Sequence, residues 1–174
     1  MKFLFTIVIV LIFEPAWSQS PDYYVKAIEK LRTKGKLTAK SSIDKTFVGS
    51  VTTYYYNDSL VLISTLTDAE AAGTETLYFL KRKVLTKAFV MESTFNSTDE
   101  WTEYFSRHKA ADKCYSCHGK MNCIMTEFTF GDKPTVVRTD NKKRIEVSMD
   151  EKDRMTKELI NTCEQLIVLS KELQ

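Results

Sequence analysis

The sequence predicts a single α+β domain, in which an antiparallel β-meander packs against N- and C-terminal helices on one of its faces. Three observations support this fold class. Segments rich in β-branched and aromatic residues fill the middle of the chain, helical patterns flank them, and turn residues separate the strands at short intervals. About 155 residues remain after a predicted signal peptide, which is enough for one domain with a sizeable core.

The first 18 residues have the three-part pattern of a signal peptide. Met1–Lys2 is a short basic start, Phe3–Phe13 is an unbroken apolar run, and Ala16 and Ser18 are small residues at the positions that a signal peptidase reads. The apolar run is shorter than the roughly 20 residues needed to cross a bilayer. We therefore expect a secreted or periplasmic protein of residues 19–174, without a stable membrane anchor.

Helices are predicted at both ends of this domain. Ser20 is a candidate N-cap before a proline at the first helical position, and Gly35 is a candidate stop. The last helix should begin at the capping box Ser148-x-x-Glu151 and run to the C-terminus. Its apolar stripe should turn Cys163 toward the core. The residues of this stripe are Met155, Leu159, Cys163, Leu166 and Leu173.

Three hairpins and one short strand are predicted between these helices. Two of the hairpins look alike, because Thr53–Tyr56 and Thr76–Phe79 each precede a polar turn and an apolar run. A further capping box, Ser97-x-x-Glu100, predicts a helix with Trp101, Tyr104, Phe105 and His108 on its inner face. The strands are expected at Phe47–Tyr56, Ser59–Leu66, Thr74–Leu80, Val84–Met91, Cys123–Phe130, Thr135–Thr139 and Arg144–Val147.

The charge of the chain is nearly balanced, with a formal net charge of +2 at pH 7. A balanced surface gives no electrostatic case for nucleic acid or for an anionic membrane. Two short basic runs, Lys81–Lys83 and Lys142–Arg144, fall where turns are expected. We interpret both as solvated turn residues.

The four cysteines predict a disulfide framework, because an exported chain with an even number of cysteines usually forms bridges. They are Cys114, Cys117, Cys123 and Cys163. Four cysteines allow three connectivities, and the sequence does not choose among them. We expect Cys163 to bond one of the other three and the remaining two to pair.

The run Cys114-x-x-Cys117-His118 also matches the attachment motif of a c-type haem. In that alternative Cys123 and Cys163 would form one disulfide, and the protein would carry electrons. The strand predicted after the motif and the lack of a suitable axial methionine favour the disulfides and no cofactor. A zinc site at the same residues and Cys163 is disfavoured, because thiols in an oxidising compartment tend to form bridges.

No catalytic residues and no metal site are predicted from the remaining sequence. The motifs of serine hydrolases, zinc proteases, phosphate-binding loops and EF-hands are all missing from the chain. An acidic segment with Asp68, Glu70 and Glu75 is best interpreted as a solvated loop. The sequence thus favours a non-enzymatic binding or inhibitor-like module, acting through its open sheet face or loops on an unknown protein or small ligand.

A family resemblance accompanies these patterns. The segments Tyr54–Ile63 and Tyr78–Leu85, behind a signal peptide, resemble small secreted proteins of unknown function of the Bacteroidetes type. The similarity covers about Tyr23–Met91. It implies a periplasmic α+β protein and carries over no catalytic residue.

Overall fold

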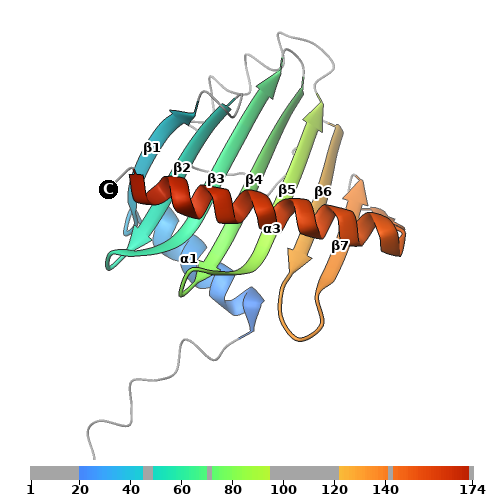
Figure 1. Ribbon diagram of the computed structural model, residues 1–174, viewed down its shortest axis with the longest axis horizontal. Helices are drawn as coiled ribbons and strands as arrows, with labels where there is room; N and C mark the ends of the chain where they lie inside the picture. The colour runs from blue at the N-terminus through green and yellow to red at the C-terminus, as the bar shows by residue number, and fades with distance from the viewer. Residues whose placement is uncertain (1–19, 45–48, 70–71, 95–121, 141–142, 173–174) are drawn as a thin grey trace, which may run out of the picture.

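An antiparallel sheet of eight strands, arranged in chain order, forms the centre of the molecule (Figure 1). The computed structural model describes residues 20–44, 49–69, 72–94, 122–140 and 143–172. The helices are α1 (Pro21–Thr33) and α3 (Met149–Glu172). The predicted α+β class, the meander and the two terminal helices are confirmed. The strands are β1 (Thr38–Asp44), β2 (Gly49–Tyr56), β3 (Ser59–Ala69), β4 (Ala72–Lys81), β5 (Val84–Thr94), β6 (Asn122–Thr129), β7 (Thr135–Asp140) and β8 (Lys143–Ile145).

Helix α1 begins and ends where the sequence predicts. Pro21 occupies the first helical position after the N-cap Ser20, although the Ser20 hydroxyl makes no capping hydrogen bond. At the other end Gly35 has a φ of 62°, which is favourable only for a residue without a Cβ. The N–H of Lys36 donates to the carbonyl of Leu31 at 2.9 Å, which closes a Schellman motif.

The β2–β3 and β4–β5 hairpins both end in two-residue turns with positive φ at both central positions. The φ angles are 47° and 60° at Asn57 and Asp58, and 53° and 66° at Arg82 and Lys83. This is the geometry of a type I′ turn, whose twist matches that of the flanking strands. The positions of both turns were predicted correctly.

Comparing Thr53–Tyr56 with Thr76–Phe79 residue by residue aligns the two hairpins two residues out of register. When the two turns are matched instead, Tyr54 is equivalent to Phe79, and each strand has a β-bulge directly after that residue. The two hairpins are therefore structural equivalents, with Asn57–Asp58 in the first occupying the positions of Arg82–Lys83 in the second.

Strand β1 was missed by the sequence analysis. Its residues, Thr38–Asp44, are mostly small and polar, so they lack the apolar alternation that identifies a strand. The predicted loop at 67–73 is also mostly strand, because β3 continues to Ala69 and β4 begins at Ala72. Glu75 of the acidic segment that was expected to form a solvated loop also lies in β4, where it pairs with Met91 of β5. Cross-strand pairing overrides the polar composition of these segments.

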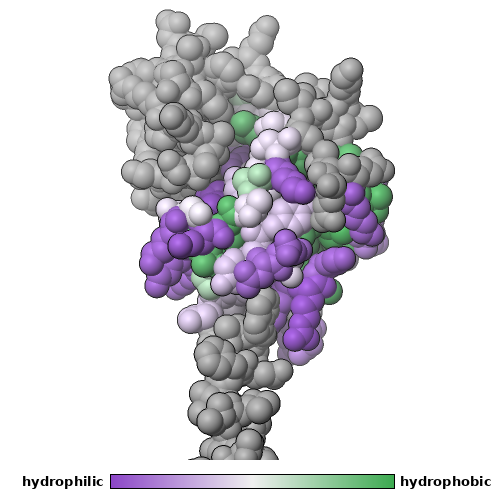
Figure 2. Space-filling model, turned by 90° about the vertical axis from the view of Figure 1, so that its left-hand side faces the viewer, coloured by the Kyte–Doolittle hydropathy of each residue, from purple (hydrophilic) through white to green (hydrophobic). Residues whose placement is uncertain are grey.

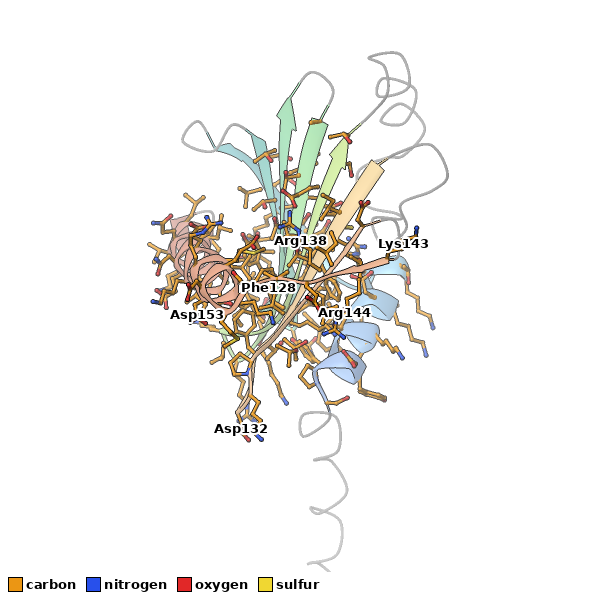
Figure 3. All side chains as sticks on the ribbon, turned by 90° about the vertical axis from the view of Figure 1, so that its right-hand side faces the viewer. Phe128, Asp132, Arg138, Lys143, Arg144 and Asp153 are labelled. Carbon is orange, nitrogen blue, oxygen red and sulfur yellow. The ribbon has the colours of Figure 1, made fainter. Side chains whose placement is uncertain are left out.

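The two helices cover opposite faces of the sheet, as Figure 3 shows with α3 on one side and α1 on the other. The prediction that both pack on one face is wrong. Strand β4 explains why, since its four consecutive residues Leu77–Leu80 are all buried and alternate between the two faces. We call the two clusters the α3 core and the α1 core. The α3 core contains Val51, Tyr55, Ile63, Tyr78, Phe128, Leu159, Cys163 and Leu166, and the α1 core contains Tyr24, Val25, Ile28, Tyr54, Leu62, Leu77, Phe79 and Phe89.

Helix α3 crosses the sheet and is fixed near both of its ends (Figure 1). Its first turn is bonded to β7, where Arg138 donates to the Glu151 carboxylate at 3.2 Å. Near its end, the hydroxyl of Tyr55 on β2 donates to the Ser170 carbonyl at 3.3 Å. At about 1.5 Å per residue the helix covers roughly 28 Å between these contacts. The five strand spacings from β2 to β7 need roughly 24 Å, so the helix length fits the sheet.

Truncating the inner side of α3 tests this packing. Leu166 is 1% exposed in the α3 core, whereas Val168 on the same helix is 56% exposed. Leu166→Ala should lower the free energy of unfolding by about 2–5 kcal/mol, because it leaves a cavity between helix and sheet. Val168→Ala should change it by no more than about 0.5 kcal/mol. Urea denaturation of both variants measures this, and equal losses would contradict the packing.

Candidate functional site

Most of the predicted cysteine site lies outside the described residues. Cys114, Cys117 and His118 belong to this part of the chain, as does the helix expected after Ser97. Of Cys123 only the backbone is described, at the start of β6, where it pairs with Ser93. The disulfides and the haem alternative therefore stay predictions.

Cys163 is the one site residue of the sequence analysis whose side chain is described. It is 2% exposed and faces the α3 core, as predicted, and it forms no disulfide with any described side chain. Burial, with a smaller effect from the charge of Glu164, raises the pKa of this thiol to about 12. A protonated, enclosed thiol is a poor nucleophile and a poor metal ligand. Cys163 thus has a packing role here, and its bridge stays a prediction.

An ionic cluster around the buried Lys87 fixes the start of α1 to the sheet. The ammonium of Lys87 on β5 has a side-chain exposure of only 5%, and it pairs with Asp22 of α1 and Glu127 of β6. It also lies 5.3 Å from the centre of the Phe89 ring. Burial acts to lower the pKa of Lys87, but hydrogen bonds and charges from the two carboxylates outweigh it and raise that pKa. The hydrogen bond to Lys87 lowers the pKa of Asp22.

Two neighbours of Tyr23 hold the first turn of α1 against the β4–β5 hairpin. Asp22 binds Lys87 on β5, and the hydroxyl of Tyr24 donates to the carbonyl of Leu80, next to the turn. Tyr23 between them is 52% exposed. The backbone of Tyr23 therefore lies near the end of the sheet where the β4–β5 turn lies, and its aromatic side chain is half exposed.

The β4–β5 turn is basic, exposed and conformationally costly. Arg82 and Lys83 are exposed, and Val84 beside them is 65% exposed. Within the described structure, the side chains of Lys81, Arg82 and Lys83 make no ion pair or hydrogen bond. Positive φ costs a residue with a long side chain about 1 kcal/mol or more, whereas Asn and Asp tolerate it better. The equivalent hairpin uses Asn57 and Asp58 at these positions.

We call Tyr23 and the turn Lys81–Val84 the basic end of the sheet. Three hairpin turns protrude together there, as the lower edge of the sheet in Figure 1 shows. The β6–β7 turn belongs to this group, because the N–H of Phe130 donates to the carbonyl of Thr86 at 2.9 Å. Its tip, Asp132, is labelled in Figure 3. The neighbouring turns contribute Asp58, Asp132 and Lys133, so cations outnumber carboxylates at this end.

A second polar cluster lies where α3 begins. Arg138 bonds Glu92 of β5 and Glu151 of α3, each at 3.2 Å. Ser148 caps the helix by accepting the N–H of Glu151, whose carboxylate binds Arg138 rather than completing the predicted capping box. On the adjacent strand, the Thr126 hydroxyl is buried without a hydrogen-bond partner, as is the Nε of Arg138. These contacts position α3.

The β1 edge of the sheet differs from the basic end in its surface. Figure 2 looks at this edge and shows hydrophilic side chains on both flanks, with paler residues between them. Thr38, Ala39 and Ser41 of β1 are exposed and small, and none carries a charge. The one basic side chain described on this strand, Lys40, is half-buried and lies 5.6 Å from the centre of the Tyr55 ring.

Comparisons with protein-family models, with curated proteins and with solved structures found no match. Among the described residues, no helix is long and apolar enough to cross a membrane, and no group of three or more His, Cys, Asp or Glu side chains could hold a metal ion. The functional interpretation therefore rests on the chain's own residues.

The turn at Lys81–Lys83 is exposed, as predicted, but its grouping with Val84 and Tyr23 could not be derived from a charge averaged over the whole chain. Lys81–Lys83 was interpreted as a solvated turn from its composition alone. One local signal was present: a two-residue hairpin turn without Asn, Asp or Gly at either central position is unusual. The role of Lys87 had no local signal, because its partner Asp22 lies 65 residues away in the chain.

The ionic cluster should leave a signature in the pH dependence of stability. The pKa of Asp22 is lowered in the folded state, so its contribution is complete above the unfolded pKa of about 4 and disappears as the pH falls through the folded value. Asp22→Asn should therefore flatten the loss of stability between about pH 5 and pH 2. The carboxylate is largely exposed, so we expect an effect within about 1 kcal/mol at pH 7.

Urea denaturation across this pH range measures the effect. The control is Asp153→Asn on the exposed side of α3, which should keep the wild-type profile. If the free energy of unfolding falls equally with decreasing pH in wild type and in Asp22→Asn, the Asp22–Lys87 pair does not stabilise the fold. Lys87 has the opposite pH dependence, because its pKa is raised in the folded state. Its contribution to stability is therefore complete at neutral pH and is lost only as the pH rises through the folded pKa.

Proposed function

We propose that the protein is an exported, non-enzymatic binding module that contacts its partner through the basic end of the sheet. One observation carries the proposal: Val84 is 65% exposed on a turn that also holds three cations without partners among the described side chains. An exposed apolar side chain beside cations without partners offers a partner both apolar contact and charge. The turn is held in place by the ladder pairs Lys81–Val84 and Leu80–Leu85, so it is presented on a rigid support.

The described groups with shifted pKa values support binding over catalysis. A catalytic centre gathers such groups in a cleft, where they reach a substrate. Here Asp22 and Lys87 join a helix to the sheet, and Tyr24 bonds a strand carbonyl. Burial in the α3 core raises the pKa values of Tyr78 and Cys163. All five groups thus serve the packing of helices on the sheet.

The start of β6 supports disulfides over haem at the cysteine motif. Strand β6 begins at Asn122, four positions after His118. A c-type haem needs an enclosing apolar pocket and a second axial ligand, which a strand starting so soon does not readily provide. We therefore propose that the exported protein carries its cysteines as bridges and holds no haem.

Intact mass and absorbance test this part of the proposal. The protein, exported in a host that matures c-type haem, should be colourless. After denaturation its mass should lie about four hydrogens below that of the reduced chain, two for each disulfide. A Soret band that survives denaturation, with the mass of one added haem, would make Cys114, Cys117 and His118 the haem site. Free thiols at all four cysteines would remove the disulfides from the proposal.

Site-specific photo-crosslinking tests the binding role. A photoreactive amino acid at position 84 should give a discrete crosslinked product in the exporting host, because this position faces the partner. The same amino acid at position 168 is a matched control, since Val168 is similarly exposed but lies on α3. Products at both positions, or at neither, would contradict a binding site at the basic end.

A further inference from the structure

We infer that the basic end binds the surface of an anionic lipid bilayer, with cations against the headgroup phosphates and with Val84 and Tyr23 in the interfacial layer. This inference rests on the proposed function and names the partner of the same site. Cations beside exposed apolar and aromatic side chains are the pattern by which peripheral proteins bind anionic membranes.

The shape of the site fits a flat partner. The turn Lys81–Val84 protrudes at the end of the sheet, next to two other hairpin turns (Figure 1). A protruding tip has no walls to surround a small molecule, which normally binds in a concave pocket. It can, however, press against a surface with its cations and with Val84 together. Tyr23 lies at the same end, because its neighbours Asp22 and Tyr24 bind β5 and β4.

The charge at this end is local and is hidden in the net charge of the chain. The formal charge of +2 argued against an anionic membrane. Screening limits electrostatic attraction to a Debye length of about 8 Å at physiological salt, so only the charges nearest the surface matter. At the β4–β5 turn these are Lys81, Arg82 and Lys83, which have no partner among the described side chains. The two neighbouring turns add Lys133, Asp58 and Asp132, so the three turns together stay net positive.

The backbone of the turn shows that its cations come at a cost to the fold. Arg82 and Lys83 both adopt positive φ, at 53° and 66°, where Asn and Gly are favoured. The equivalent hairpin meets the same requirement with Asn57 and Asp58. A sequence selected for stability alone would place similar residues in both turns. Cations at these positions are explained if they bind a ligand, since functional residues often reduce stability.

This trade-off gives a test in which lost binding cannot be attributed to lost folding. The double variant R82N/K83G creates the favoured type I′ turn and removes two cations. Its melting temperature should rise by about 2–4 °C. Its partition onto vesicles of equal parts phosphatidylglycerol and phosphatidylcholine should fall by roughly 25-fold, from about 5-fold for each cation. Vesicle co-sedimentation of the purified exported protein measures the partition.

The equivalent hairpin supplies the matched control. Asp58→Gly creates an Asn-Gly turn there, which should also raise the melting temperature, because glycine is favoured at a φ of 60°. It removes a negative charge instead of a positive one, so it should not weaken vesicle binding. A second variant, Val84→Ser, should lower binding several-fold without affecting the fold, since this side chain is 65% exposed.

The outcomes separate this inference from the proposed function. Wild-type protein should bind the mixed vesicles, bind pure phosphatidylcholine weakly, and lose binding as salt rises. Failure to bind the mixed vesicles, equal binding to both vesicles, or unchanged binding by R82N/K83G would overturn the lipid inference. If the crosslink at position 84 then leads to a single acidic protein, the binding function stands with a different partner. If that crosslink is also missing, both fail.

Discussion

The sheet of this protein is apolar on both faces, and most of the architecture follows from that constraint. Buried residues occur consecutively in β4, from Leu77 to Leu80, so one helix cannot cover them all. Helix α1 therefore covers one face and α3 the other. Among the described residues, the parts of the sheet that stay exposed lie at its two edge strands, its strand ends and its hairpin turns, and the basic end is one of them.

The two helices are fixed to the sheet in the same way, although their sequences are unrelated. Each has a carboxylate in its first turn that pairs with a cation on a strand: Asp22 with Lys87 for α1, and Glu151 with Arg138 for α3. A carboxylate is favourable there because the N-terminus of a helix carries partial positive charge. The apolar clusters supply most of the attraction, while these ion pairs determine where each helix begins on its face.

Local signals predicted the elements, and non-local contacts determined what was missed. The turn at Asn57–Asp58 and the stop at Gly35 depend on residues adjacent in sequence, so both were predictable. Strand β1 forms because β2 pairs with it, and its polar residues gave no signal. The packing of helices on two faces was predictable in principle, because runs such as Leu77–Leu80 are typical of sheets covered on both sides. The contact of Lys87 with α1 was not predictable, because its partner Asp22 lies 65 residues away in the chain.

The position of α3 after all the strands that it covers has a consequence for how the protein is made. Neighbouring strands are consecutive in sequence, so the meander can assemble hairpin by hairpin as the chain emerges. The face that α3 covers, including Ile63, Tyr78 and Phe128, stays open until residues 149–172 have followed. During synthesis the chain thus carries an exposed apolar sheet face, which is the condition under which nascent proteins depend on chaperones.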